Sequence, residues 1–202
     1  KDNININKCI IKDPRQGYKS QISLSGDAAH KGNNVDLQVG INQMDAALLD
    51  LAVPFLTANK SFTRYQNALS TATQGKVAGF GTTIVNFNGS VKGNPKKLVS
   101  LLGELSINSL PMVKMNLDKS SIIPFNTHLS YDANFNAAEN IAKINKLDFK
   151  VKEDQRQLVT MSLQSPLRID INNQKITSEK DDELNLLMDK LDINFLKPFM
   201  GC

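Results

Sequence analysis

The sequence predicts a mainly β chain of the α+β class, built on a long antiparallel sheet with two or three short helices. Three successive stretches between Phe125 and Ile171 alternate apolar and polar residues one for one. Because successive side chains of a strand point to opposite faces, this period predicts strands with one apolar and one polar face. Helix-like runs near residues 45–70 and 95–102 interrupt the pattern. The 202 residues, 41% of them hydrophobic, suffice for one elongated β-rich domain over residues 1–202.

The first half of the chain contains four further strand signals. Runs of alternating or β-branched apolar residues are separated by turn residues such as Asp13-Pro14 and Gly32-Asn33. Strands are therefore expected at residues 4–11, 18–27, 35–41 and 85–91. The period changes after Asp45, a candidate N-cap for a helix that Pro54 interrupts, and a second helix is expected from Ser61 through Leu69.

Glycine and proline residues interrupt the middle of the chain. The stretch with Gly75, Gly79 and Gly81 fits neither GxGxxG nor GxxxxGK[ST], so it is interpreted as a bent or bulged strand rather than a phosphate loop. Pro95 is expected at the first position of a helix over 95–102. Two more strands are expected on either side of a break near Pro111.

One pattern occurs twice. The apolar residues of 37–55, which include a Met-Asp pair and end in Pro-Phe, recur in the same order over 184–199 with a short deletion before the proline. Repeated supersecondary units are typical of elongated assemblies, so the chain is interpreted as an excised segment of a longer, repeat-containing protein. Chance similarity of two short segments is the competing explanation.

Composition disfavours several classes of partner. The net charge is +4 and the pI about 9.0, but the lysines are scattered and alternate with carboxylates around Asp148, as on a solvated strand face. A nucleic-acid partner is therefore not expected. Aromatic residues make up 6% of the chain and there is no Trp, which disfavours stacking platforms for bases or sugars.

No pattern of catalytic residues stands out. The only histidines are His30 and His128, and His128 lies near Asp132 without a third ligand at a telling spacing. The acidic run 181–183 is typical of a solvated turn. Cys9 and Cys202 form no metal-binding pattern, and the sequence leaves open whether they pair. We expect a protein that is not an enzyme and needs no metal or other cofactor.

Four segments resemble the AsmA-like proteins of the bacterial envelope, a group that includes TamB-type relatives and is similar to the eukaryotic bridge-like lipid-transfer proteins. The resemblance covers most of the chain from about Tyr18 onward. The segments that carry it are Val35 to Phe55, Phe87-Asn88-Gly89-Ser90-Val91-Lys92-Gly93-Asn94-Pro95-Lys96-Lys97-Leu98, Leu102-Gly103-Glu104-Leu105-Ser106-Ile107-Asn108 and Leu163-Gln164-Ser165-Pro166-Leu167-Arg168-Ile169.

The resemblance implies a long twisted sheet curled into a half-open groove or barrel-like gutter, whose apolar inner surface carries phospholipid acyl chains between two membranes. It also implies a periplasmic location and a membrane anchor outside this segment. The expected helices depart from a bare gutter and are candidates to plug or cap it. Burying each CH₂ of an acyl chain in such a groove is worth about 0.8 kcal/mol.

Nine apolar residues of the alternating stretches are the candidates for the lipid-binding surface of the groove. They are Phe125, Leu129, Tyr131, Leu147, Phe149, Val151, Val159, Met161 and Leu163. The alternative hypothesis is a structural or adhesive β-sandwich module of a cell-surface or secreted protein, in which the same residues form a closed core.

Overall fold

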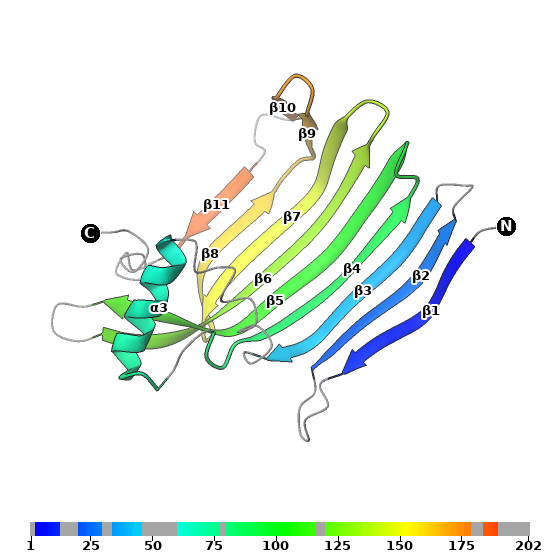
Figure 1. Cartoon of the computed structure of the whole chain (residues 1–202). Helices are drawn as coiled ribbons and strands as arrows, with labels where there is room; N and C mark the ends of the chain where they lie inside the picture. Colours follow the sequence, from blue (N-terminus) through cyan, green and yellow to red (C-terminus); the bar gives the residue numbers. More distant parts are fainter. Residues whose placement is uncertain are drawn as a thin grey trace.

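The computed structural model describes residues 3–12, 20–29, 34–45, 60–76, 80–115, 120–178 and 184–189. These residues form one open antiparallel sheet and one helix (Figure 1). The elements are β1 (Asn3–Lys12), β2 (Gln21–Ala29), β3 (Asn34–Asp45), α3 (Lys60–Thr73), β4 (Ile84–Gly93), β5 (Leu98–Met115), β6 (Ser120–Asn136), β7 (Ile141–Glu153), β8 (Arg156–Leu163), β9 (Leu167–Asp170), β10 (Lys175–Ser178) and β11 (Leu184–Met188).

The strand order follows the chain almost without exception. Neighbouring strands pair in the order β1-β2-β3-β4-β5-β6-β7-β8-β11, so β1 and β11 lie at the two edges of the sheet. β8 and β9 pair with different parts of the same strand, β7. β10 then pairs with β9, and β11 pairs with β8. The predicted antiparallel sheet is therefore confirmed. All the described strands belong to this one sheet, so they do not form the two sheets of a sandwich.

Helix α3 packs at one end of the sheet, over a projection of β5 and β6 beyond their neighbours (Figure 1). Its Tyr65 and Leu69 are buried against Val113 of β5 and Ile122 of β6. The Tyr65 hydroxyl donates a hydrogen bond of 2.5 Å to the backbone oxygen of Pro111. These residues form a buried hydrophobic cluster between the helix and the sheet. The helix expected from residue 61 is therefore confirmed.

The same projection explains why β5 runs through Pro111, where the sequence predicted a break. Pro111 pairs with Pro124 at positions beyond the reach of β4 and β7, whose pairing partners on β5 and β6 end at Asn108 and begin at Phe125. A proline is tolerated on a strand edge because no hydrogen bond to a further strand is lost there.

The helix predicted over 95–102 is wrong. Residues 95–97 form a turn, and β5 begins at Leu98. Val99 and Leu101 point to one face, while Leu98 and Leu102 point to the other and are 51% and 56% exposed. Because both faces carry apolar residues here, the apolar residues have the same spacing as the apolar stripe of a helix. The described residues thus contain one helix, and residues 46–59, where another was expected, lie outside them.

The described ends of the glycine-rich stretch are turns and not parts of a bent strand. Helix α3 ends in a Schellman motif, in which the N–H groups of Gln74 and Gly75 donate to the carbonyl oxygens of Thr71 and Ser70. Gln74 and Gly75 have φ angles of 54° and 76°, and Gly81 lies in a second turn with φ 61°. Gly79 lies outside the described residues.

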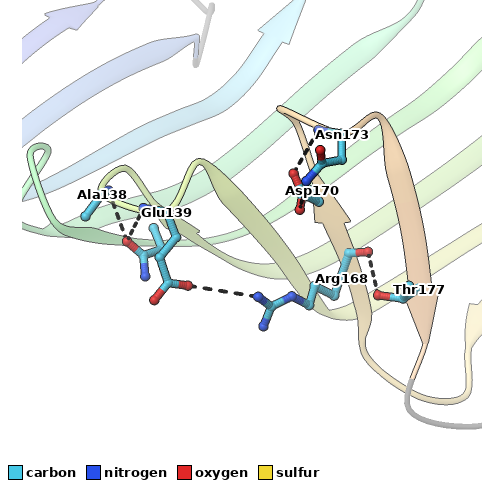
Figure 2. Close-up of polar contacts among 7 residues, drawn as sticks. Ala138, Glu139, Arg168, Asp170, Asn173 and Thr177 are labelled. Atoms are coloured by element: carbon cyan, nitrogen blue, oxygen red, sulfur yellow. Dashed lines mark hydrogen bonds and ion pairs between the residues drawn. The ribbon is translucent and has the colours of Figure 1, made fainter.

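The corner where β9 turns into β10 is held by polar contacts (Figure 2). The Asp170 carboxylate accepts hydrogen bonds from the side-chain and backbone nitrogens of Asn173 at 2.9 and 3.0 Å, and these bonds lower the pKa of Asp170. An exposed ion pair of 4.0 Å joins Arg168 of β9 to Glu139 in the turn before β7. The corner therefore ties the β9-β10 hairpin to the neighbouring strand.

The strands of the predicted repeat are both present. β3 and β11 run in the same direction in the sheet, and their apolar residues face the same side. The Pro-Phe ends of both copies lie outside the described residues, as do His30, Cys202 and the acidic run 181–183.

Candidate functional site

The register brings most apolar residues of the strands onto one face, in rows that cross the sheet. One row joins all the strands of the path from β1 to β11. It consists of Ile11, Ile22, Ile41, Phe87, Leu105, Leu129, Phe149, Met161 and Leu186. Every member is apolar, and each is the direct cross-strand neighbour of the next. Such neighbours have Cβ atoms about 5 Å apart, so the row is continuous.

Parallel rows lie on both sides of this one. Toward α3 the next row contains Met44, Val85, Ile107, Thr127, Val151, Val159 and Met188. In the other direction the rows contain Cys9, Leu24, Val39, Gly89, Gly103, Tyr131 and Leu147, then Ile6, Gly26, Leu37, Val91, Leu101, Ala133, Ile144 and Leu167, then Ile4, Ala28, Val35, Gly93, Val99, Phe135, Ala142, Ile169 and Ile176. We call these rows together the apolar face.

The apolar face is large for a surface of a soluble chain. Its strands span ~38 Å at ~4.8 Å per strand, and its rows span ~26 Å along the strands, on the order of 1,000 Å² in geometric area. Contiguous apolar patches of soluble monomers rarely exceed a few hundred Å². A face of this size needs a cover.

No second layer of the described residues supplies that cover. Contacts between the described elements are dominated by neighbouring strands, and the helix packs mainly against β5 and β6. Helix α3 packs against Ile122, which points to the opposite face from Phe125 because the two residues are three positions apart along β6, an odd number. The helix expected as a plug for the groove thus lies on the other side of the sheet. Residues in the middle of the apolar face are half-buried by their neighbours, whereas Ile11 and Leu186 at its edges are 63% and 55% exposed.

All nine residues predicted for the lipid-binding surface point to this side of the sheet. Seven belong to the rows given above, and Phe125 and Leu163 continue the alternation of β6 and β8 on the same side. Eight of them are half-buried, and the ninth, Phe125, is 5% exposed because it packs with Leu158, a residue at a bulge of β8. Sequence reasoning missed the members from β1 to β5 and from β11. Their signal was present, since the same alternation runs through residues 35–41 and 85–91, but only the register shows that these rows continue those of β6, β7 and β8.

The opposite face is polar and carries shallow hollows. One hollow of about 320 Å³ is lined by side chains that include Asn86, Glu104, Ser106 and His128, and a second of about 400 Å³ lies beside it over β3 to β7. Ion pairs on this face, such as Lys92 with Asp36 at 2.9 Å, are exposed. The lysines of β7 that alternate with carboxylates around Asp148 therefore lie on a solvated strand face.

The polar face offers no assembled metal site within the described ranges. No group of three or more His, Cys, Asp or Glu side chains is placed there to hold an ion. His128 is exposed between Ser106 of β5 and Lys150 of β7, while the side chain of Asp132 accepts a hydrogen bond of 3.1 Å from Asn145. The structure thus does not bring His128 and Asp132 together as an acid-base pair.

In the part of the chain that the structure describes, no helix has the length and apolar character to cross a bilayer. Comparison of the chain with protein-family models, with curated proteins and with solved structures finds no match.

Proposed function

We propose that this chain binds lipid without catalysing a reaction, holding acyl chains against its apolar face in the envelope of a bacterium, in the periplasm. The observation that carries the proposal is the row from Ile11 to Leu186, which crosses the sheet without a polar residue and is not covered by the described residues. Such a surface substitutes for the interior of a bilayer.

The dimensions of the apolar face suit hydrocarbon chains. One leaflet of a bilayer has a hydrocarbon thickness of ~15 Å, so a row of ~38 Å is long enough for an acyl chain to lie along it. Each CH₂ removed from water contributes about 0.8 kcal/mol. An extended chain therefore gains several kcal/mol without any specific polar contact, and a headgroup remains free to reach water.

The backbone contains devices that favour a curved sheet, as a gutter requires. β3 and β5 each carry a bulge close to the central row, at Gln43 and Ser109, and both bulge residues have positive φ angles of 50° and 57°. Bulges bend a strand and increase its twist. Gly89 and Gly103 are direct cross-strand neighbours, and glycines inside strands often mark a bend. The proposed half-open groove rests on these features.

The decisive experiment compares two leucines of nearly equal exposure on opposite faces. Leu186 on the apolar face is 55% exposed, and Leu102 on the polar face is 56% exposed. The chain is expressed in bacteria, and bound phospholipid is measured by native mass spectrometry and by lipid extraction. We expect lipid on the parent chain, less lipid on Leu186→Asp and an unchanged amount on Leu102→Asp.

A second pair of variants tests the middle of the surface. Phe149→Asp and Met161→Asp place charges in adjacent positions of the central row and should remove the lipid while the far-ultraviolet circular dichroism is retained. Parent protein that contains no lipid, together with loss of the fold in both variants, would contradict the proposal. That outcome is expected if these residues are the closed core of an adhesive or structural module.

A further inference from the structure

Strand β1 pairs with β2 on one side and with no described strand on the other, and its sequence has an unusual pattern. Its residues on the apolar face are Ile4, Ile6, Cys9 and Ile11, and a bulge separates the first two from the last two. At the bulge, Asn7 and Lys8 lie opposite the single residue Ser25 of β2, so the side-chain alternation shifts by one residue there. The strand is exposed, since Ile4 and Ile11 are 64% and 63% accessible.

This pattern is self-complementary. When two copies of β1 pair antiparallel about a two-fold axis between Asn7 and Lys8, Ile4 lies opposite Ile11 and Ile6 lies opposite Cys9, and each pairing occurs twice. Because the bulge changes which residues face which side, no other antiparallel register matches all four apolar residues to one another. A strand without the bulge would place Ile4 and Ile11 on opposite faces.

The charges of β1 agree with the same register. Lys8 lies opposite Asn7 of the second copy, and Lys12 lies opposite Asn3, so no two lysines face each other. Like charges directly opposite across a strand pair are destabilising, and this arrangement avoids them although lysines are the only charged residues of the strand. An axis perpendicular to the sheet also keeps the apolar faces of both copies on the same side, so that their rows join.

We propose that β1 pairs with β1 of a second copy of this chain in this register, forming a two-fold dimer with one continuous apolar face. The inference rests on the register and the charges of β1 and does not depend on lipid binding. An exposed edge strand is a template for pairing, and a second copy of β1 matches this template at all four of its positions on the apolar face.

The oligomeric state of the full chain is the first test. Sedimentation velocity should show a dimer in the micromolar range. Ile11→Lys places a charge opposite Ile4 at two symmetric positions and should raise the dimer dissociation constant about tenfold or more. Ile176→Lys is the matched control, because Ile176 on β10 is 65% exposed and lies far from β1 in the sheet. The control should leave the dimer unchanged, and a monomeric parent chain would overturn the proposal.

Cross-linking tests the register itself. In a Cys202→Ser background, Ile6→Cys places the new thiol opposite Cys9 of the second copy, and directly opposed residues of an antiparallel pair are about 4.5–5.5 Å apart at Cα, within the range of a disulfide. Mild oxidation should give a covalent dimer, whereas Ile176→Cys should not. Association of β1 with β11 would instead give open chains of copies sensitive to Leu186→Lys, and that result would also overturn the proposal.

Discussion

The ring of Tyr131 lies directly over Gly103 on the neighbouring strand, on the apolar face of the sheet. A Cβ atom added to Gly103 would be 2.6 Å from the Tyr131 hydroxyl oxygen and 2.7 Å from its Cζ. Gly89, the neighbour of Gly103 on β4, is covered in the same way by Phe87, whose Cζ would be 2.5 Å from an added Cβ. Two aromatic rings thus fill the space that the glycines leave, and the surface stays apolar.

Gly103→Ala should therefore destabilise the chain by displacing Tyr131. We expect a loss of about 1–3 kcal/mol in the free energy of unfolding, the range for overpacking at a close contact. Tyr131→Leu removes the displaced ring, so Gly103→Ala should cost much less in that background. Urea unfolding of the four proteins of this double-mutant cycle measures the coupling. Additive effects would show that the ring does not depend on the glycine.

Gly26 should tolerate substitution far less than Gly75. Gly26 has a φ of 133°, and an added Cβ would be 1.9 Å from the backbone oxygen of Asp36, which cannot move without breaking the pairing of β2 and β3. Gly75 has a φ of 76° with open space around it. Gly75→Ala should cost about 1–2 kcal/mol from the backbone conformation alone, whereas Gly26→Ala should lower the yield of folded protein or its melting temperature much further. Equal melting temperatures would contradict this expectation.

Two bulges depend on asparagine side chains from the next strand. The backbone N–H of Gln43 donates to Asn86 Oδ1 at 2.8 Å, and that of Ser109 donates to Asn126 Oδ1 at 3.1 Å. Asn126→Ala removes the acceptor and should cost about 1–2 kcal/mol, while Asn126→Asp keeps an acceptor and should cost less.

The matched control for Asn126 is another asparagine of β6. Asn134 accepts a hydrogen bond of 2.7 Å from the exposed Ser100 side chain, and no backbone donor depends on that bond. Asn134→Ala should therefore cost less than about 0.5 kcal/mol in urea unfolding. If Asn134→Ala costs as much as Asn126→Ala, the asparagine does not act through the bulge.

The sequence predicts strand existence well because the period of two is an unambiguous signal wherever one face is polar. It failed at residues 98–102, where Leu98 and Leu102 put apolar side chains on the polar face and the alternation disappears. It also failed at Pro111, because a proline is excluded from a central strand and only the pairing shows that this part of β5 is an edge. Only the second error concerns which strands are neighbours.

The sequence predicted an apolar surface on β6 to β8, but it did not predict that this surface extends across the whole sheet. The nine residues from β6 to β8 were identified by alternation alone, yet the row that joins Ile11 to Leu186 depends on where each bulge shifts the register. A shift of one residue in any strand would turn its apolar side chains to the polar face. The periodicity within one strand carries no information about its register with the neighbouring strands. For the same reason, the sequence could not predict which face of the sheet α3 covers.

Tyr65 makes the stability of the chain depend on alkaline pH. Burial raises its pKa from 10.0 to about 12, so at intermediate pH the hydroxyl is ionised in the unfolded chain and protonated in the folded one. The folded state then binds more protons, and stability must fall as pH rises through this window. The contribution of Tyr65 is complete below pH 10 and is lost progressively from about pH 10 to about pH 12.

Tyr65→Phe separates this effect from the titration of other groups. Phenylalanine keeps the contacts with Leu69 and Val113 but loses the hydrogen bond to Pro111, so at pH 8 the variant should be about 1 kcal/mol less stable than the parent chain. The advantage of the parent chain should shrink between pH 10 and pH 12, because only the parent must keep a buried hydroxyl protonated. Urea unfolding at pH 8 and pH 11 measures both gaps. Equal gaps at the two pH values would mean that Tyr65 does not titrate differently in the folded and unfolded chains.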